Sequence, residues 1–181
     1  MKNQKKAHPD RDRESDVQLS DFESLLSDGE GIVVIKTDLE DPNPALRDFV
    51  ALRVVEDSHP RQSTKYRLWP LYNYAVAIDD YHLGITHVLR GKDHLNNTLK
   101  QKWIYKYLGW DEPEYIHYGL VSIPNTNLKT SKIRESIKNG EFSGWNDCRL
   151  ATLKGLARRG YRPETFLKYW ENSGLKEVDI K

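Results

Sequence analysis

A run of lysines around a hydroxyl residue is the first place in this sequence where chemistry is expected. LKTSKI (128–133) follows a strand-like segment, and we expect it to form a flexible loop ahead of a helical segment. Lys132 could neutralise charge on a polyphosphate, and Ser131 could donate a hydrogen bond to it. Lys-Thr-Ser-Lys is also an ordinary surface loop, so this interpretation needs support from elsewhere in the chain.

Arg90 is a second candidate, because it ends a short apolar run, ITHVLRG (85–91), that is typical of a buried strand. Ligands of parallel sheets bind at the C-terminal ends of the strands. The planar fork of an arginine placed there would hold a carboxylate. The alternative, equally open from the residues alone, is an ion pair with Asp79, Asp80 or Asp93.

The charge of the chain is small but unevenly distributed. The formal net charge is +1, yet the stretch from Lys129 to Lys168 has ten Lys or Arg residues against four acids. Such a stretch attracts polyanions. A solvated helical surface of mixed charge is the alternative, and composition does not separate the two.

What the sequence lacks excludes several classes of protein. Cys148 is the single cysteine, so an intrachain disulfide and a cysteine-based metal cluster are both excluded. No apolar run approaches the roughly 20 residues that cross a bilayer, and the first residues, MKNQKKAHPDRDRES, have no apolar core like that of a secretory signal. We therefore expect a cytoplasmic protein with no membrane partner.

Histidines near acids suggest a metal site, but their spacing matches no recognised ligand pattern. The residues are His82, His87 and His94, with Asp79, Asp80 and Asp93. We expect structural or surface roles for them and no metal. No Ser-His-Asp set, Walker loop or dinucleotide fingerprint is found, and the ten tyrosines and five tryptophans suit a core and its rim better than a base-stacking platform.

The first third of the chain is expected to be rich in strands. Residues 1–18 carry nine charged side chains and should be loose unless something docks on them. The apolar spacing over 17–26 predicts a helix. Two strand-like runs follow, at 31–38 and 50–57, with Asp-Pro-Asn-Pro (41–44) breaking the chain between them.

From residue 71 onward, helices and strands are expected to alternate. The predicted elements are a helix over 71–84, a strand over 85–91, a helix over 96–110 opened by Asn96 or Asn97, and a strand over 114–123. The second of these helices has one apolar side, made by Leu99, Trp103, Ile104, Tyr107 and Leu108. This order predicts a parallel sheet with crossover helices. Two C-terminal helices, 149–160 and 163–174, complete the prediction.

Four stretches of the chain resemble the archaeal and eukaryotic type of glutamyl-tRNA synthetase, within the class I glutamyl/glutaminyl group. They occur in the family's order and cover most of residues 29–175. They are NPALRDFVALRVV (43–55), YRLWPLYNYAVAIDDYHLGITHVLRGKDHLNNTLKQKWIYKYLGW (66–110), LKTSKI (128–133) and SGWNDCRLATLKGLARRGY (143–161). The third is similar to the second class I signature, KMSKS, in a variant form, which favours the phosphate interpretation of the lysine run.

The resemblance implies an α/β fold that contains the second half of a class I synthetase Rossmann-like parallel sheet. In its terms, residues 1–64 are a β-rich remnant of the acceptor-binding insertion with the return strands. Residues 65–127 are the second half of the Rossmann-like catalytic fold. Residues 128–181 hold the KMSKS-type loop and a helical segment that contacts the tRNA stem.

The resemblance also implies an activity, the ligation of glutamate to tRNA(Glu). The family joins glutamate to ATP, releases pyrophosphate and transfers the glutamyl group to the terminal adenosine of the tRNA. Tyr72 and Arg90 match its amino-acid-binding positions. Lys129, Ser131 and Lys132 match the ATP-phosphate loop, where Mg²⁺ shares the charge and the last two residues are catalytic. Positioning and charge stabilisation, rather than a protein general base, then supply most of the rate.

Further roles follow from the same resemblance. An arginine at position 90 favours glutamate, because a buried cation opposite an amide would be left unpaired. Asn96 aligns with a position that approaches the tRNA acceptor stem. Lys154, Arg158 and Arg159 match the segment that touches the inner side of the tRNA, where phosphate contacts position the RNA without reading its sequence.

The sequence departs from the family in three respects. The first signature, a His-x-Gly-His-type element (HIGH), is absent, the anticodon-binding β-barrels are absent, and Cys148 replaces a usual proline, which we expect to loosen a turn. We therefore expect this chain alone to be inactive, and a separate chain could carry the HIGH half. Two alternatives stay open: a non-catalytic tRNA-binding module derived from a synthetase, and a stand-alone enzyme acting on another carboxylate.

Overall fold

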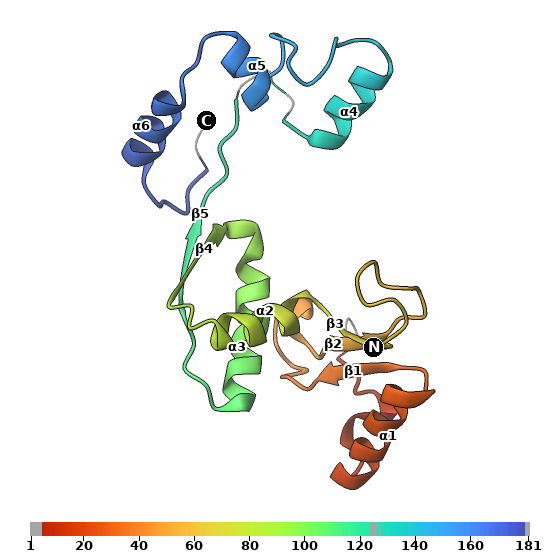
Figure 1. Ribbon diagram of the computed structural model, residues 1–181. Helices are drawn as coiled ribbons and strands as arrows, with labels where there is room; N and C mark the ends of the chain where they lie inside the picture. Colours follow the sequence, from red (N-terminus) through yellow and green to blue (C-terminus); the bar gives the residue numbers. More distant parts are fainter. Residues whose placement is uncertain (1–4, 124–125, 127, 180–181) are drawn as a thin grey trace. The chain divides into compact units, whose positions relative to one another are not determined.

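The two strand-like runs of the first third pair in an antiparallel sheet (Figure 1). In the computed structural model, which describes residues 5–123, 126 and 128–179, they form β1 (Ile32–Ile35) and β2 (Phe49–Val54). A third strand, β3 (Leu68–Pro70), pairs with the other edge of β2. The two predicted strands are thus confirmed with shorter bounds. The third was missed because three residues are too few to show alternation.

The chain divides into two compact units. Unit 1 comprises Met1–Val88 and Asp93–Tyr115, and unit 2 comprises Leu89–Lys92 and Ile116–Lys181. The boundaries of these units differ from those of the predicted segments 1–64, 65–127 and 128–181, and the predicted segments remain a prediction. No helix in the described part of the chain is long and apolar enough to span a membrane.

The core of unit 1 lies where β2 meets two helices, α2 (Tyr72–His82) and α3 (Leu95–Leu108). Its buried members are Phe49, Ala77, Ile104 and Tyr105, with Ile35, Tyr74, Trp103 and Trp110 packed against them. Apolar burial of this kind is the main force that holds the sheet and the helices together. The predicted N-terminal helix is confirmed as α1 (Ser15–Ser27), but none of its residues is buried.

The buried face of α3 differs from the prediction. Of the apolar side that we expected, Ile104 is buried, but Leu99, Tyr107 and Leu108 are 42%, 59% and 42% exposed. The other buried residues of the helix are Thr98, Gln101 and Tyr105. Apolar residues are spread around this helix, so periodicity did not define one stripe and the contacts with the rest of unit 1 decided the face.

Residues 1–18, expected to be loose unless something docks on them, are bonded to the rest of unit 1 in their described part, with Lys5 forming an ion pair with Glu40 at 2.7 Å. A short 3-10 helix, η2 (Pro9–Asp12), precedes α1, and Arg11 from it bonds to Asp48 and Thr37. Thr37 and Asp48 lie in the connection between β1 and β2, which also contains a second 3-10 helix, η3 (Pro44–Leu46). The N-terminal segment is therefore attached to the rest of unit 1 at Arg11 and at Lys5.

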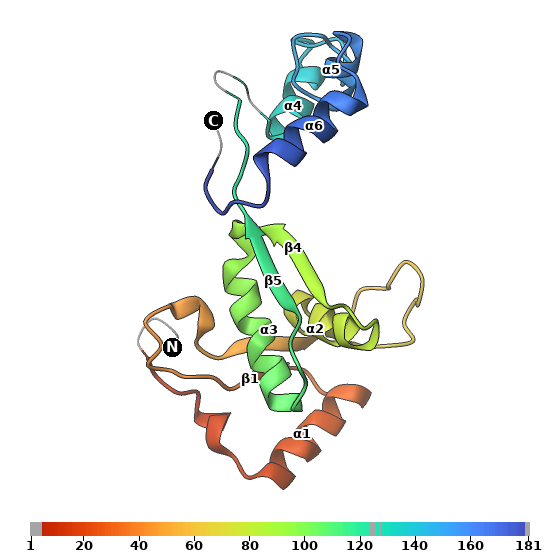
Figure 2. The ribbon, with the colours of Figure 1, turned by 90° about the vertical axis from the view of Figure 1, so that its left-hand side faces the viewer.

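The predicted α/β crossover is confirmed by a pair of adjacent strands, β4 (His87–Gly91) and β5 (Glu114–Tyr118). The 3-10 helix η4 (Lys92–His94) and then α3 connect them. The N–H of Glu114 donates to the carbonyl of Thr86 (2.9 Å) where both strands begin, and Figure 2 shows the two strands running in the same direction. The pair is parallel, and the helical connection supplies the crossover that parallel neighbours need.

The α-helices in the described part of unit 2 are α4 (Thr130–Lys138), α5 (Leu153–Arg158) and α6 (Pro163–Ser173). The last confirms the predicted helix over 163–174. The helix predicted over 149–160 is confirmed only as the shorter α5, because residues 149–152 belong to the turn in front of it.

The end of unit 2 lies beside the residues that follow β5. The N–H of Gly119 donates to the carbonyl of Lys176 (2.7 Å), and the N–H of Leu120 donates to Oδ1 of Asp179 (2.8 Å). Lys92, just past β4, forms an ion pair with the same carboxylate at 2.8 Å. A side chain at position 119 would overlap the backbone of Val178, so glycine is required there.

Candidate functional site

The lysine run forms the start of a helix rather than a flexible loop. Lys129 directly precedes α4, and Thr130, Ser131 and Lys132 make up its first turn. The predicted loop is therefore wrong over these residues. Ile133 is buried with 5% exposure, and its N–H donates to the carbonyl of Lys129 at 3.0 Å, so packing and the first helical hydrogen bond both hold the turn.

The first turn of α4 is suited to an anion. The leading N–H groups of a helix have no acceptor within the helix, and the helix dipole adds partial positive charge at that end. The Ser131 and Lys132 side chains are exposed. The Lys132 ammonium makes no ion pair or hydrogen bond to another residue of the described ranges. Backbone donors, a hydroxyl group and an ammonium group are thus available to a phosphate.

Arg90 lies at the C-terminal end of a parallel strand, as predicted. It is the residue before Gly91 in β4 and is 9% exposed. A buried guanidinium is a strong and directional partner for a carboxylate. Arg90 and Lys132 both belong to unit 2, whereas Tyr72 and Asn96 belong to unit 1.

Tyr72 is the first residue of α2 and is 49% exposed. Its ring centroid lies 5.9 Å from that of His94. The Nδ1 atom of His94 is 3.0 Å from Nδ2 of Asn97, and its Nε2 atom is 3.7 Å from Oδ2 of Asp93. The sequence predicts a structural or surface role for His94. No sequence pattern indicates that His94 lies near Tyr72, the predicted amino-acid-binding residue.

Asn96 is the second residue of α3 and is exposed. Its Oδ1 accepts a 2.7 Å hydrogen bond from Nδ2 of Asn43. The expectation that Asn96 or Asn97 opens the helix is wrong: His94 is the N-cap, and it makes no side-chain cap bond. The Asn96 side chain is instead held by Asn43, which lies outside α3 in the connection between β1 and β2.

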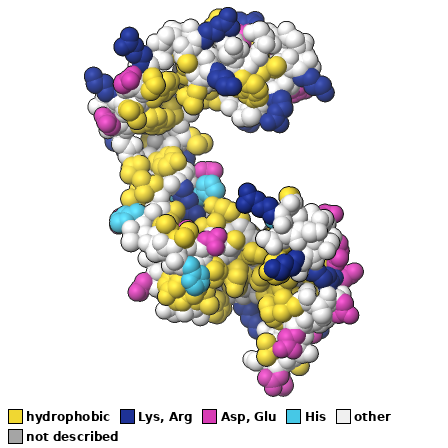
Figure 3. All heavy atoms as spheres, in the orientation of Figure 1, with side chains coloured by type: hydrophobic (Ala, Val, Ile, Leu, Met, Phe, Trp, Pro, Cys, Tyr) yellow, Lys and Arg dark blue, Asp and Glu magenta, His cyan; other side chains and the backbone are white. Residues whose placement is uncertain are grey.

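The basic residues predicted to touch RNA gather at α5. Lys154 and Arg158 are four residues apart and lie on the same side of the helix, and Arg159 is its C-cap. All three side chains are exposed. The Arg159 guanidinium lies 5.4 Å from the Tyr161 ring centroid. Figure 3 shows Lys and Arg side chains spread over the surface of unit 2 around α4–α6, which suits a polyanionic partner.

A buried carboxylate in unit 2, paired with an exposed arginine, was missed by sequence reasoning. Asp147 is 4% exposed, and Arg149 donates to both its oxygens, from Nε at 3.0 Å and from Nη2 at 2.7 Å. These bonds, with those from Ser143, hold the pKa of the Asp147 carboxyl well below its ordinary value. The available signal was an aspartate within a turn of small and polar residues, where such side chains bond to nearby N–H groups.

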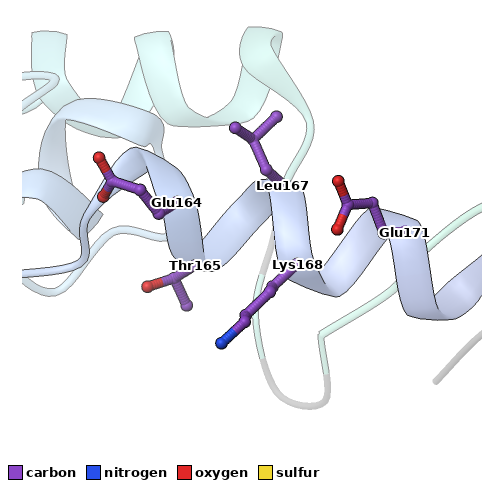
Figure 4. A pocket seen from close by; sticks show the side chains of 5 residues that line it. All are labelled: Glu164, Thr165, Leu167, Lys168 and Glu171. Atoms are coloured by element: carbon purple, nitrogen blue, oxygen red, sulfur yellow. The ribbon is translucent and has the colours of Figure 1, made fainter.

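Two hollows on the surface do not involve the predicted residues. One lies along α6 alone, lined by Glu164, Thr165, Leu167, Lys168 and Glu171 (Figure 4). The other, in unit 1, is lined by Asp41, Leu46, Leu99, Lys102, Trp103 and Lys106. Within the described ranges, no group of three or more His, Cys, Asp and Glu residues could hold a metal ion.

Comparison with known proteins gives consistent matches. A model of the tRNA synthetases class I (E and Q) catalytic domain matches residues 1–180. The chain is 50% identical to the glutamate–tRNA ligase of Thermoplasma volcanium over 175 residues, which are 94% of this chain and 32% of that protein. It is 52% identical to the glutamate–tRNA ligase of Methanothermobacter thermautotrophicus over 154 residues, 85% of this chain and 28% of that protein.

The chain thus spans about a third of the length of these curated relatives. Among solved structures, it is similar to a glutamate tRNA ligase from Elizabethkingia meningosepticum with 23% identity and a TM-score of 0.49, covering 94% of this chain and 35% of that chain.

Proposed function

Because the chain belongs to the family of class I tRNA synthetases (E and Q), catalytic domain, we propose that it is part of a glutamate–tRNA ligase. The observation that carries the proposal is identity of about one half to ligases of that name over most of this chain. The chemistry of the candidate residues agrees with it, since Arg90 could pair with an acid, and separate sets of basic residues could pair with a polyphosphate and an RNA.

In the proposed reaction, an oxygen of the glutamate α-carboxylate attacks the α-phosphorus of ATP, and pyrophosphate leaves. A hydroxyl group of the terminal adenosine of the tRNA then takes the glutamyl group, and AMP leaves. Negative charge develops on phosphate oxygens in the first step. Groups that stabilise this charge and hold the reactants in line account for most of the rate.

Lys132 and Ser131 are the proposed catalytic residues, with Lys129 as a further ATP ligand. Their place in the first turn of α4 lets the helix N–H groups act with the side chains on the phosphates. Mg²⁺ is proposed to arrive with the nucleotide, because this ion is usually held by phosphates and water with one or two carboxylates. It neutralises phosphate charge, and the residues described here add the ammonium and hydroxyl groups.

Tyr72 and Arg90 are proposed to bind glutamate. A guanidinium that is 9% exposed has lost most of its water, so an anionic partner regains more free energy than a neutral one. This favours the side-chain carboxylate of glutamate over the amide of glutamine.

The RNA partner is proposed to be tRNA(Glu). Lys154, Arg158 and Arg159 contact phosphates, which positions the RNA without reading its sequence. Asn96 approaches the acceptor stem. We place the enzyme in the cytoplasm. The part of the site that bears the HIGH signature must come from outside these residues, either from a longer form of this protein or from a separate chain.

The test is glutamate-dependent ATP–pyrophosphate exchange in the presence of tRNA(Glu). We expect none from the 181-residue chain alone and exchange when a segment that carries the HIGH signature is supplied. Exchange by the chain alone would show that its site is complete. No exchange in the complemented mixture, from two segments that are each folded and that bind one another, would remove the ligase assignment.

The second candidate is a non-catalytic tRNA-binding module derived from a synthetase. The exposed cations of α5 favour it, because they need no adenylation site. It predicts tight, salt-sensitive tRNA binding and no exchange in any mixture. The two candidates therefore differ in the exchange assay and agree in the binding assay.

A further inference from the structure

A single buried carboxylate organises the turn in front of α5. Asp147 accepts five hydrogen bonds from described residues: from N and Oγ of Ser143 (3.0 and 3.2 Å) and from N, Nε and Nη2 of Arg149 (3.0, 3.0 and 2.7 Å). A carboxylate with this many donors is held in one orientation. The side-chain partners of Asp147 are Ser143 and Arg149 rather than Lys154, Arg158 or Arg159, so it acts on those cations as a positioning residue.

Arg149 also contacts the residues that follow α4. Its Nη2 also donates to the carbonyl of Glu141 (2.7 Å), and its guanidinium lies 4.9 Å from the centroid of the Phe142 ring. Residues 141–149 are therefore closed around one ion pair. We call this segment the Asp147 clamp.

The helix α5 packs against the clamp. The Thr152 hydroxyl donates to the carbonyl of Trp145 (2.5 Å) and accepts from the N–H of Gly155 (3.0 Å), which caps the helix. Gly155 is packed so closely that a Cβ would lie 2.5 Å from the Leu150 carbonyl oxygen and 2.7 Å from that of Asp147. Nη1 of Arg158 lies 3.5 Å from the Asn146 carbonyl oxygen.

A helix of six residues has little stability of its own, because nucleation costs more than so few hydrogen bonds return. The position of α5 is therefore set by the clamp beneath it. Lys154 and Arg158 are the exposed cations of this helix, and Arg159 ends it. Contacts with the regularly spaced phosphates of an RNA require such cations to be held in place.

We propose that Asp147, held by Arg149, is the positioning residue that places Lys154, Arg158 and Arg159 against the phosphates of an RNA duplex. This inference rests on the proposed binding of tRNA. It adds a residue that acts through the geometry of α5 and whose own charge opposes RNA binding.

Because the negative charge of Asp147 by itself weakens RNA binding, a substitution separates the effect of this charge from the effect of positioning. Asp147→Asn removes a negative charge, so the change in charge by itself strengthens RNA binding. Loss of the hydrogen bonds that close the Asp147 clamp displaces the cations of α5 and so weakens RNA binding. We expect Asp147→Asn to lower the affinity of the chain for tRNA(Glu) transcript by about 3- to 10-fold, as measured by fluorescence anisotropy at fixed salt, because about one phosphate is no longer neutralised. Glu171→Gln, which removes the same charge from the exposed surface of α6, is the matched control and should bind as tightly as the parent or more tightly.

Two readouts separate positioning from a general loss of folded protein. The slope of log affinity against log salt should become less steep by about 0.7 to 0.9 for each phosphate that the variant no longer neutralises, whereas a smaller folded fraction leaves the slope unchanged. Arg158→Ala should also cost less in the Asp147→Asn background than in the parent, because Arg158 is already displaced there. If Asp147→Asn does not fold by circular dichroism, Arg149→Lys, which keeps the charge and removes the planar fork, replaces it in both measurements.

The outcomes are distinct. Weaker binding with a shallower slope and a non-additive pair supports the inference. Binding equal to that of Glu171→Gln with an unchanged slope overturns the inference and leaves the proposed function standing. No measurable, salt-sensitive binding by the parent chain contradicts the RNA-binding part of the proposed function and the inference with it.

Discussion

Nε of Arg11 donates a 2.9 Å hydrogen bond to Oδ2 of Asp48, although 37 positions separate the two residues in the sequence. Nη2 of Arg11 also donates to the carbonyl of Thr37 (2.7 Å), and Oδ1 of Asp48 accepts from the N–H of Thr37 (2.8 Å). The Thr37 hydroxyl accepts from the N–H of Asp48 and donates to the carbonyl of Leu46, both at 2.6 Å. The Arg11 guanidinium thus attaches the N-terminal segment to the connection between β1 and β2, in addition to the exposed ion pair of Lys5 with Glu40.

Arg11→Ala should destabilise unit 1 by about 1–3 kcal/mol, because the Asp48 carboxylate, 14% exposed, is left without its charged partner. The measurement is the free energy of unfolding in urea. Arg13→Ala is the control: Arg13 pairs with Asp10 and Asp21 at exposed positions, and we expect a loss below about 1 kcal/mol. Equal losses in the two variants would mean that the Arg11 contact is no more than a surface ion pair.

Gly155→Ala should lower stability even though alanine is the better helix former. The gain in helix propensity is about 1 kcal/mol, and the overlap of the new Cβ with two carbonyl oxygens costs about 1–3 kcal/mol and displaces α5. Thermal unfolding and tRNA anisotropy report the two effects. Lys154→Ala in the same helix should leave stability within about 0.5 kcal/mol. A Gly155→Ala variant more stable than the parent would show that α5 shifts freely on the clamp.

The stability of unit 2 should depend on pH through Asp147. The hydrogen bonds from Arg149 and Ser143 depress the pKa of this carboxyl in the folded protein, so the unfolded chain takes up its proton first as the pH falls. The stabilisation is complete at neutral pH and is lost progressively below about pH 4.

The comparison of the parent with Asp147→Asn detects this contribution. The difference in melting temperature, followed by circular dichroism, should be largest near neutral pH and should shrink as the pH falls below about 4. The Glu171→Gln variant corrects for the charge change. A difference that stays constant over the whole range would count against a depressed pKa.

Lys132→Ala should lower glutamate-dependent exchange by the complemented enzyme by about 10²-fold, which is typical of removing one group that stabilises charge in the transition state. Lys138→Ala, in the last turn of the same helix, carries the same charge change away from the first turn and should have little effect. Similar rates for the two variants would leave Lys132 without a role at the phosphates.

Arg90→Gln should weaken the use of glutamate by about 10- to 100-fold in kcat/KM, because a charge-assisted hydrogen bond to the carboxylate is removed. Discrimination against glutamine should fall at the same time. Arg53→Gln, at an exposed position of β2, is the control. Unchanged discrimination in Arg90→Gln would mean that another group selects the amino acid.

Local patterns were enough for the elements that follow from short-range physics. The strands at 31–38 and 50–57, the helix at 71–84, the crossover between β4 and β5 and the helix that begins at Pro163 all follow from alternation, apolar periodicity and terminal signals. The exposed cations of α5 and the place of Arg90 at a strand end follow from the same patterns.

Tertiary structure decided the rest, because long-range contacts leave no trace in local spacing. It placed Ser131 and Lys132 in a helical turn through the burial of Ile133, and it chose the face of α3 that carries Gln101 rather than Leu99. It joined Arg11 to Asp48, and it closed the turn that contains Cys148 through Asp147 and Arg149. The sequence by itself determined which residues could carry charge to a ligand, and packing determined which of them are held in a fixed position.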